Sequence, residues 1–263
     1  MKKGVEILSW SAFTLVVLIL LVFVDYSYSA IPCRAPEVNI VQEDGHHFIT
    51  EELVLDKIYN LGYSLDDATY QEIDVADIEA EISKTAGVKN VEVVELNNGI
   101  VVLNINENRP IARVINVDGL VSFYLNEEGG VMPLSQDYVA RVPVFTGDIY
   151  YTSSNVLSVS KIKSSDSLKN IHILDDIYDV ALAIDKDEFI KSQTLQVFVN
   201  RNKEFELIPR VGRNRIMLGS SENIEDKLKK LKRFYIEAIK PQELNNYDTI
   251  SLKYHNQIIC SKR

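Results

Sequence analysis

The sequence contains few of the residues and none of the motifs that mark common enzymes and metal proteins. Its 263 residues include 2 cysteines and 4 histidines, and it lacks P-loop, dinucleotide-binding and Gly-x-Ser-x-Gly fingerprints. His46 and His47 are adjacent, but neighbouring side chains on an irregular segment point apart, and no cysteine or third histidine is near them in the chain. His172 and His255 are isolated. We therefore expect no metal site, no cofactor and no enzymatic activity.

Paired acidic residues are the other candidates for catalysis. Asp175-Asp176 falls on a charged helix face and Glu127-Glu128 falls in a turn, and neither pattern indicates a pocket that could raise or lower a carboxyl pKa for catalysis. Ser220-Ser221 precedes an expected helix, and its hydroxyls are explained by capping. These residues give no support for an enzyme.

Disulfide bonds are limited to one, because only Cys33 and Cys260 are present. An exported compartment would permit a bridge. The two residues lie at opposite ends of a chain long enough for two domains, however, and nothing in the pattern brings them together. We predict two free thiols.

Clusters of basic residues and low-complexity tracts are also missing. The formal net charge is −10 and the lysines and arginines are scattered, which argues against nucleic acid and against anionic lipid as partners. No long Pro/Ser-rich or single-sign tract occurs, so we expect little disorder and protein partners.

One long apolar run is present, from Ile7 to Val24. It contains 18 residues without a charge, and at about 1.5 Å per helical residue it nearly crosses a hydrocarbon core of about 30 Å. Lys2 and Lys3 precede it and Asp25 follows it, so the positive-inside bias predicts a cytoplasmic N-terminus with the rest of the chain outside. The alternative is a cleaved signal peptide, with Ser27-Tyr28-Ser29 before the cleavage point, but the run is longer than a signal core. In both cases the chain after this run is exported from the cytoplasm.

The segment after this run predicts a small α+β unit. Val38 to Val41 is a short strand candidate. Thr50 and Asp74 are placed to cap two amphipathic helices that end near Gly62 and Gly87. Apolar residues then alternate with polar ones on either side of Asn97-Asn98-Gly99, a pattern typical of a β-hairpin. A β-α-α-β-β unit of this size covers one face of its sheet with helices and leaves an edge open.

From residue 108 onward the pattern becomes rich in strands. Short alternating runs separated by turn residues predict a mixed sheet, and two amphipathic segments, Leu168–Ile184 and Glu222–Ile239, predict helices on it. The polar stretch Thr152–Ser167 is expected to be a loop. The final run, Thr249–Ile259, is expected to be one strand that closes the sheet, with Ser251, Lys253 and His255 on one face.

Several strings, in this order along the chain, resemble the FtsQ/DivIB cell-division family. Glu107–Ala112 (Glu-Asn-Arg-Pro-Ile-Ala) is similar to the family's Arg-Pro-x-Ala junction, and Tyr124–Met132 is similar to its hairpin of aromatic and acidic residues and glycine. Val142–Gly147 looks like its Leu-Pro-x-x-x-Gly segment. Ile216–Gly219 precedes a basic helix as in the family, and Ile250–Tyr254 resembles its last strand, which carries a Leu-Arg-Tyr pattern.

The resemblance covers nearly the whole chain and implies its organisation. We expect a cytoplasmic tail and transmembrane helix in residues 1–29, a POTRA-like domain in 30–107 and a β-domain with a partner-binding strand in 108–263. It implies a non-enzymatic divisome scaffold that resides in the inner membrane at the septum, with its bulk periplasmic or extracytoplasmic. The implied partners are FtsB-like and FtsL-like membrane-anchored proteins, with the FtsB-like chain adding a strand to the C-terminal edge.

Four residues follow from this resemblance and from the strand pattern as candidates for partner contact: Ser251, Lys253, Tyr254 and His255. Lys253 stands where the family has a basic residue that pairs with an acidic partner, although an ammonium cannot form the two-pronged bond of a guanidinium. Without the family, Lys253 would be a solvated strand charge and Tyr254 a core aromatic.

Two other classes of function fit parts of the sequence. An envelope assembly or transport factor would use the POTRA-like domain to hold unfolded strands, although such proteins usually carry several copies of it. A membrane-tethered cell-wall hydrolase would need a cleft with two acidic residues or a metal.

Overall fold

The computed structural model describes residues 2–41, 48–65, 68–85, 87–135, 138–151, 159–164 and 173–263. The chain divides into two compact units, Met1–Glu107 and Asn108–Arg263. His46, His47 and His172, discussed above, lie outside the described residues. Each unit is described by itself.

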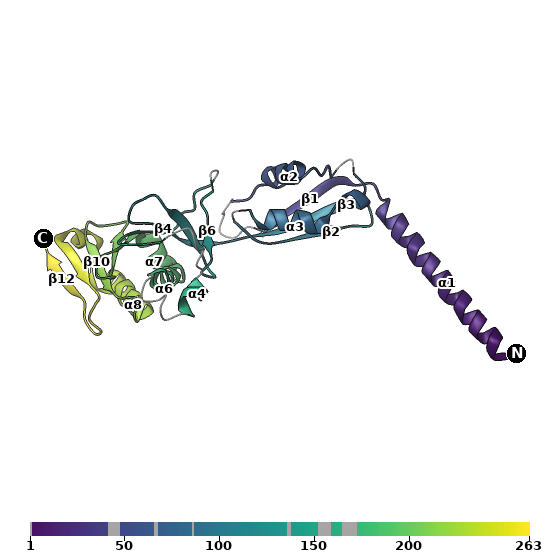
Figure 1. The fold of residues 1–263 in the computed structure, drawn as a ribbon. Coiled ribbons are helices and arrows are strands. Elements are labelled where there is room, and N and C mark those ends of the chain that lie inside the picture. Colours follow the sequence, from purple (N-terminus) through teal and green to yellow (C-terminus); the bar gives the residue numbers. More distant parts are fainter. Residues whose placement is uncertain are drawn as a thin grey trace. The chain divides into compact units, whose positions relative to one another are not determined.

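Unit 1 begins with the long helix α1 (Lys2–Ser29), coloured purple in Figure 1. The part from Trp10 to Ser29 is long and apolar enough to cross a membrane, by length and composition, and none of it is buried. The helix therefore includes the apolar run Ile7–Val24 and extends past both its ends. At its far end, the Tyr28 hydroxyl donates to the Glu95 carbonyl oxygen at 3.2 Å.

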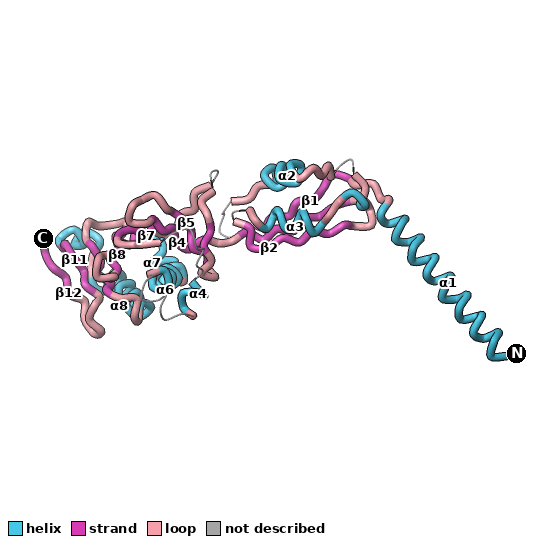
Figure 2. Tube along the Cα trace, in the orientation of Figure 1, coloured by secondary structure: helices cyan, strands magenta, loops and turns pink. Residues whose placement is uncertain are grey.

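The rest of unit 1 has the strand, helix, helix, strand, strand order predicted from the sequence (Figure 2). Within the described residues its strands form one sheet in the order β1-β3-β2, with β1 parallel and β2 antiparallel to β3. Buried residues of both helices and alternate residues of the central strand form its core. The elements are β1 (Arg34–Val41), α2 (Glu51–Asn60), η1 (Tyr70–Glu72), α3 (Val75–Ser83), β2 (Val88–Glu95) and β3 (Ile100–Glu107).

Local chemistry sets the helix boundaries of unit 1 as expected. The Thr50 hydroxyl accepts a hydrogen bond from the Leu53 amide, and the Asp74 carboxylate accepts from two amides of the first turn of α3. Gly62, just after α2, has φ +97°, a conformation that glycine adopts without strain. The expectation that the first strand begins at Val38 was wrong, because β1 begins at Arg34. Pro36 made the start of this strand hard to recognise, because proline argues against a strand except at an edge, where one side is unpaired.

Unit 2 contains a larger sheet that mixes parallel and antiparallel pairs. Among the described residues its strand order is β12-β11-β10-β9-β8-β7-β4-β5-β6. Its strands are β4 (Pro110–Ile115), β5 (Ser122–Asn126), β6 (Val131–Met132), β7 (Val144–Gly147), β8 (Thr194–Val199), β9 (Phe205–Pro209), β10 (Arg215–Gly219), β11 (Tyr247–Ser251) and β12 (Ile259–Lys262).

Helices gather against this sheet, as Figure 1 shows for α6, α7 and α8. Ile177 and Val180 of α6 and Leu228 and Leu231 of α8 are buried in one apolar cluster with the sheet, which includes Phe145. Burial of such side chains is the main stabilising term of the unit. The helical elements are α4 (Val159–Lys163), α6 (Leu174–Asp185), α7 (Glu188–Gln193), α8 (Ile224–Arg233), the π-helix η2 (Phe234–Ala238) and η3 (Pro241–Asn246).

The two predicted helices of unit 2 are present with changed ends. α6 starts at Leu174, and residues 165–172 lie outside the described part. The second helix ends as α8 at Arg233 and continues as η2. Ser221 does not cap it: Asn223 occupies that position with φ 52° and no side-chain cap, and the Ser221 hydroxyl donates to the Asp176 carboxylate instead.

Two short α-helices, α4 and α7, were not predicted. α7 has six residues, too few to show a helical period, although Asp187 caps it. α4 lies inside the stretch Thr152–Ser167 that was expected to be a loop. The remainder of that stretch, 152–158 and 165–167, is outside the described residues.

Candidate partner-docking edge

The C-terminal run differs most from the sequence prediction. Thr249–Ile259 is not one strand: β11 ends at Ser251, the chain turns through 252–258, and β12 returns antiparallel to β11. β11 also pairs in parallel with β10 on its other side. Ser251 is therefore paired with Met217 of β10 and with Ile259 of β12. The expected docking strand is flanked on both sides by its own chain.

β12 forms one edge of the larger sheet, and β6 forms the other. No strand among the described residues pairs with the outer side of β12. The Arg263 amide donates to the Asn246 carbonyl oxygen at 3.2 Å, which is on the β11 side. Because successive amides of a strand point to opposite sides, the N–H groups of Cys260 and Lys262 face outward. These amides form the unoccupied edge.

Lys253 lies in the turn after β11 and is engaged within the molecule. Its Nζ is 2.6 Å from Oε2 and 2.7 Å from Oε1 of Glu204, which precedes β9. The hydrogen bond from Lys253 lowers the pKa of Glu204 below its ordinary value. Charge pairing of Lys253, inferred from the family as a contact to a partner, is satisfied here by the protein's own carboxylate.

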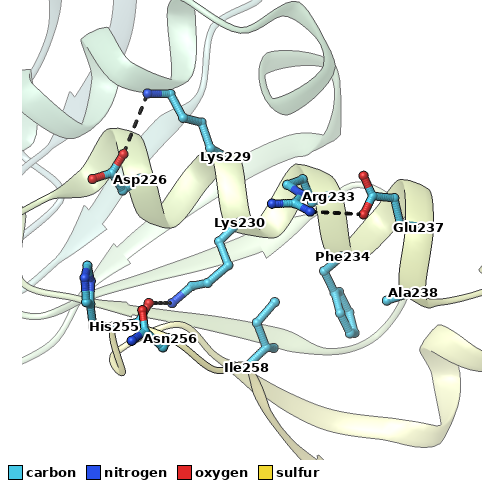
Figure 3. A pocket seen from close by; sticks show the side chains of 10 residues that line it. All are labelled: Asp226, Lys229, Lys230, Arg233, Phe234, Glu237, Ala238, His255, Asn256 and Ile258. Atoms are coloured by element: carbon cyan, nitrogen blue, oxygen red, sulfur yellow. Dashed lines mark hydrogen bonds and ion pairs between the residues drawn. The ribbon is translucent and has the colours of Figure 1, made fainter.

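Tyr254 and His255 are exposed, as is Lys253, whereas Ser251 is half-buried. Tyr254 is 52 % exposed, so it is not a core aromatic. His255 borders a surface pocket of about 480 Å³ between the turn and α8 (Figure 3). The pocket walls carry Lys229 and Arg233 from α8 and the apolar side chain of Ile258. The structure thus gathers three of the four predicted residues, Lys253, Tyr254 and His255, in one turn.

Lys230 is a functional candidate that the sequence prediction missed. In Figure 3 its side chain points from α8 towards the turn, whereas Lys229 points to Asp226 and Arg233 to Glu237. Its ammonium donates to the His255 carbonyl oxygen at 3.3 Å. A lysine on an amphipathic basic helix gives no sequence signal for such a contact. The polar triplet His255-Asn256-Gln257 between apolar residues could have indicated the turn.

The acidic pairs and possible metal ligands considered in the sequence are placed as follows. Among the described residues, no three His, Cys, Asp or Glu side chains are grouped as metal ligands would be. The Glu127 carboxylate is paired with Arg109 at 3.0 Å. Burial raises the pKa of Asp175, with the Asp176 charge adding to the effect. Cys33 and Cys260 are both free thiols, as predicted.

Comparison with known proteins gives two matches. Residues 109–261 match the model of the FtsQ/DivIB C-terminal related family, and residues 31–106 match the model of the POTRA-like domain. No curated protein matches the chain. The first match alone spans more than half of the sequence.

Proposed function

The chain belongs to the FtsQ/DivIB family, and from this premise we propose that it recruits membrane-anchored division proteins by accepting a partner strand on the outer side of β12. The partners we propose are FtsB-like and FtsL-like proteins. Membership of this family makes the chain a division-associated scaffold with partners in the division complex, and non-enzymatic scaffolding is the family's role.

The unoccupied edge of β12 is the observation that carries the proposal. A strand edge offers a row of N–H and C=O groups, so a partner strand gains affinity from backbone bonds and selectivity from alternating side chains. β12 is 4 residues long, which suits a short partner segment. A short edge strand is also a common way to prevent indiscriminate pairing between sheets.

The predicted contact residues take different roles in this proposal. Ser251 acts from inside the sheet, since its backbone is paired on both sides and it supports β12. Tyr254 and His255 are exposed in the turn between β11 and β12 and are available to partner side chains. Lys253 keeps its turn in place through Glu204 and presents less free charge to a partner.

Placement in the cell follows from α1 and the family. α1 suits a single membrane anchor by length and composition, and the family acts at the septum. We propose that the N-terminus is cytoplasmic and that the chain after α1 lies outside the cytoplasm. Lys2 and Lys3 lie just before the apolar run, whereas the first basic residue after it is Arg34, and basic residues favour the cytoplasmic side.

The outward amide of Lys262 provides a direct test. Lys262→Pro removes that donor, whereas Lys262→Ala removes only the side chain and serves as the matched control. One backbone hydrogen bond contributes roughly 0.5–1.5 kcal/mol, so capture of an FtsB-like partner by the full-length protein should weaken about twofold to twelvefold with proline. Alanine should leave capture near the wild-type level. Equal capture by both variants and the wild type would exclude the β12 edge as the docking site.

A further inference from the structure

Four backbone carbonyl oxygens of the β11–β12 turn surround one side chain from α8. The Lys230 ammonium lies 3.4 Å from the carbonyl oxygen of Leu252, 2.5 Å from that of Tyr254, 3.3 Å from that of His255 and 3.4 Å from that of Gln257. An ammonium has three N–H donors, so it can bond or share bonds with all four oxygens. The charge sits where the turn folds back on itself.

The neighbouring basic residues of α8 are used differently. Lys229 lies 3.7 Å from Asp226, and Arg233 lies 3.5 Å from Glu237, both within the same helical segment (Figure 3). Lys230 instead reaches from the helix to the β11–β12 turn. Burial lowers the pKa of Lys230 below its ordinary value, which is consistent with an ammonium partly withdrawn from water.

The contact links a firmly packed element to a weakly packed one. α8 is anchored by the buried side chains of Leu228 and Leu231. β12 pairs on one side only among the described residues, and Ile259, Ser261 and Lys262 in it are exposed. Elements with few buried contacts and one-sided pairing are the first to open locally. Without a tether at the turn, β12 would be prone to detach from β11.

We propose that Lys230 is a positioning residue that fixes the β11–β12 turn and so holds β12 ready for a partner strand. This inference rests on the proposed function for its biological use, but its structural part concerns the free protein alone. A strand already held in place binds with less loss of conformational freedom than one that must first be ordered. Loss of the ammonium should therefore weaken capture even though Lys230 need not touch the partner.

Hydrogen exchange in the free full-length protein tests the structural part. Lys230→Met keeps an unbranched side chain of similar length and removes the charge, and Lys229→Met is the matched control on the same helix. We expect amide protection to fall at least tenfold in residues 252–262 of Lys230→Met and to stay unchanged in β8 and β9. Unchanged protection of 252–262 would overturn the proposal, whatever happens to capture.

A covalent substitute for the tether tests the functional part. Thr249 and Ser261 are directly opposite on β11 and β12, and facing strand residues are close enough for a disulfide. Thr249→Cys with Ser261→Cys, in a Cys260→Ser background, should restore capture to Lys230→Met when oxidised and lose it again when reduced. If the oxidised form keeps β12 protected but capture is not restored, Lys230 contacts the partner and the positioning role is wrong.

The two experiments separate this inference from the proposed function. If Lys262→Pro leaves capture intact while Lys230→Met exposes β12 to exchange, the docking edge lies elsewhere and Lys230 is a tether of the turn alone. If Lys262→Pro weakens capture and Lys230→Met changes neither capture nor exchange, the edge is correct and the tether is not.

Discussion

The Lys253 ammonium lies 2.6 Å from the Glu204 carboxylate and thereby joins the turn after β11 to the turn before β9. β10 runs between those two strands in the sheet. The Lys253 stem passes over Gly219 at the end of β10, where an added Cβ would lie 3.1 Å from its Cγ. The ion pair therefore spans three strands at one end of the sheet, beside the proposed docking edge.

Charge reversal at this pair distinguishes an internal role from contact with a partner. Lys253→Glu places two carboxylates together and should weaken capture, with a stability loss of about 1 kcal/mol at most, since exposed pairs contribute little. The double exchange Lys253→Glu with Glu204→Lys restores the internal pair. We expect the double variant to regain capture in a pull-down.

If the double variant remains as defective as Lys253→Glu, Lys253 binds an acidic group of the partner directly. Glu204→Gln is the accompanying control, because it frees the Lys253 charge without introducing a new one.

Gly147 at the end of β7 should be intolerant of a side chain. It has φ +110°, and an added Cβ would lie 2.1 Å from the Val199 carbonyl oxygen. Gly147→Ala should cost about 3 kcal/mol of unfolding free energy, because a backbone shift must add to the strain of positive φ. Gly119→Ala is the control, since Gly119 has φ +71° with no atom within 4 Å of an added Cβ, and should cost about 1 kcal/mol. Urea unfolding would compare them, and equal costs would contradict the close approach.

The start of unit 2 depends on a shielded ion pair. Arg109 Nη2 lies 2.8 Å from Asp185 Oδ2, with side-chain exposures of 16 % and 8 %. Asp185→Asn should lower the unfolding free energy by about 2–3 kcal/mol, because it leaves the guanidinium short of one compensating charge. Asp226→Asn, which breaks an exposed pair with Lys229, should cost less than about 0.5 kcal/mol. Chemical denaturation would measure both, and similar losses would show that shielding has no effect.

The same carboxylate should make stability depend on acidity. Burial pushes the pKa of Asp185 upward, but hydrogen bonds and charge from Arg109 and Lys191 outweigh it and hold that pKa below its ordinary value. A carboxyl with a depressed folded pKa stabilises the protein above its unfolded value, near pH 4, and loses that contribution as pH falls through the folded value.

The difference in unfolding free energy between wild type and Asp185→Asn should therefore be full at about pH 7 and shrink below about pH 4. Denaturation midpoints across this range would show it. A difference that stays constant down to about pH 2 would mean that the Asp185 charge is not the cause.

Local chemistry in the sequence predicted more of the fold than of the site. Thr50 and Asp74 cap helices where their positions indicate, because a cap depends on residues three positions away. The prediction of one C-terminal strand was wrong because Ile250, Leu252 and Tyr254 continue the alternating pattern past the real end of β11. In the structure, β11 ends where Leu252 donates to Met217 and the Lys230 ammonium binds the turn that leads back into β12. Those contacts are distant in sequence, as is Glu204 from Lys253. Alternation alone does not report where pairing stops.

The order of strands in unit 1 determines how it bears mechanical tension. α1 leads into the start of β1, and the end of β3 leads through Asn108 and Arg109 to unit 2. β1 and β3 are parallel neighbours, so a pull applied to α1 at one end and to unit 2 at the other drags them lengthwise in opposite directions. Their evenly spaced hydrogen bonds then share the load together and do not open one after another. A constricting septum could thus pull on α1 without unfolding the sheet of unit 1.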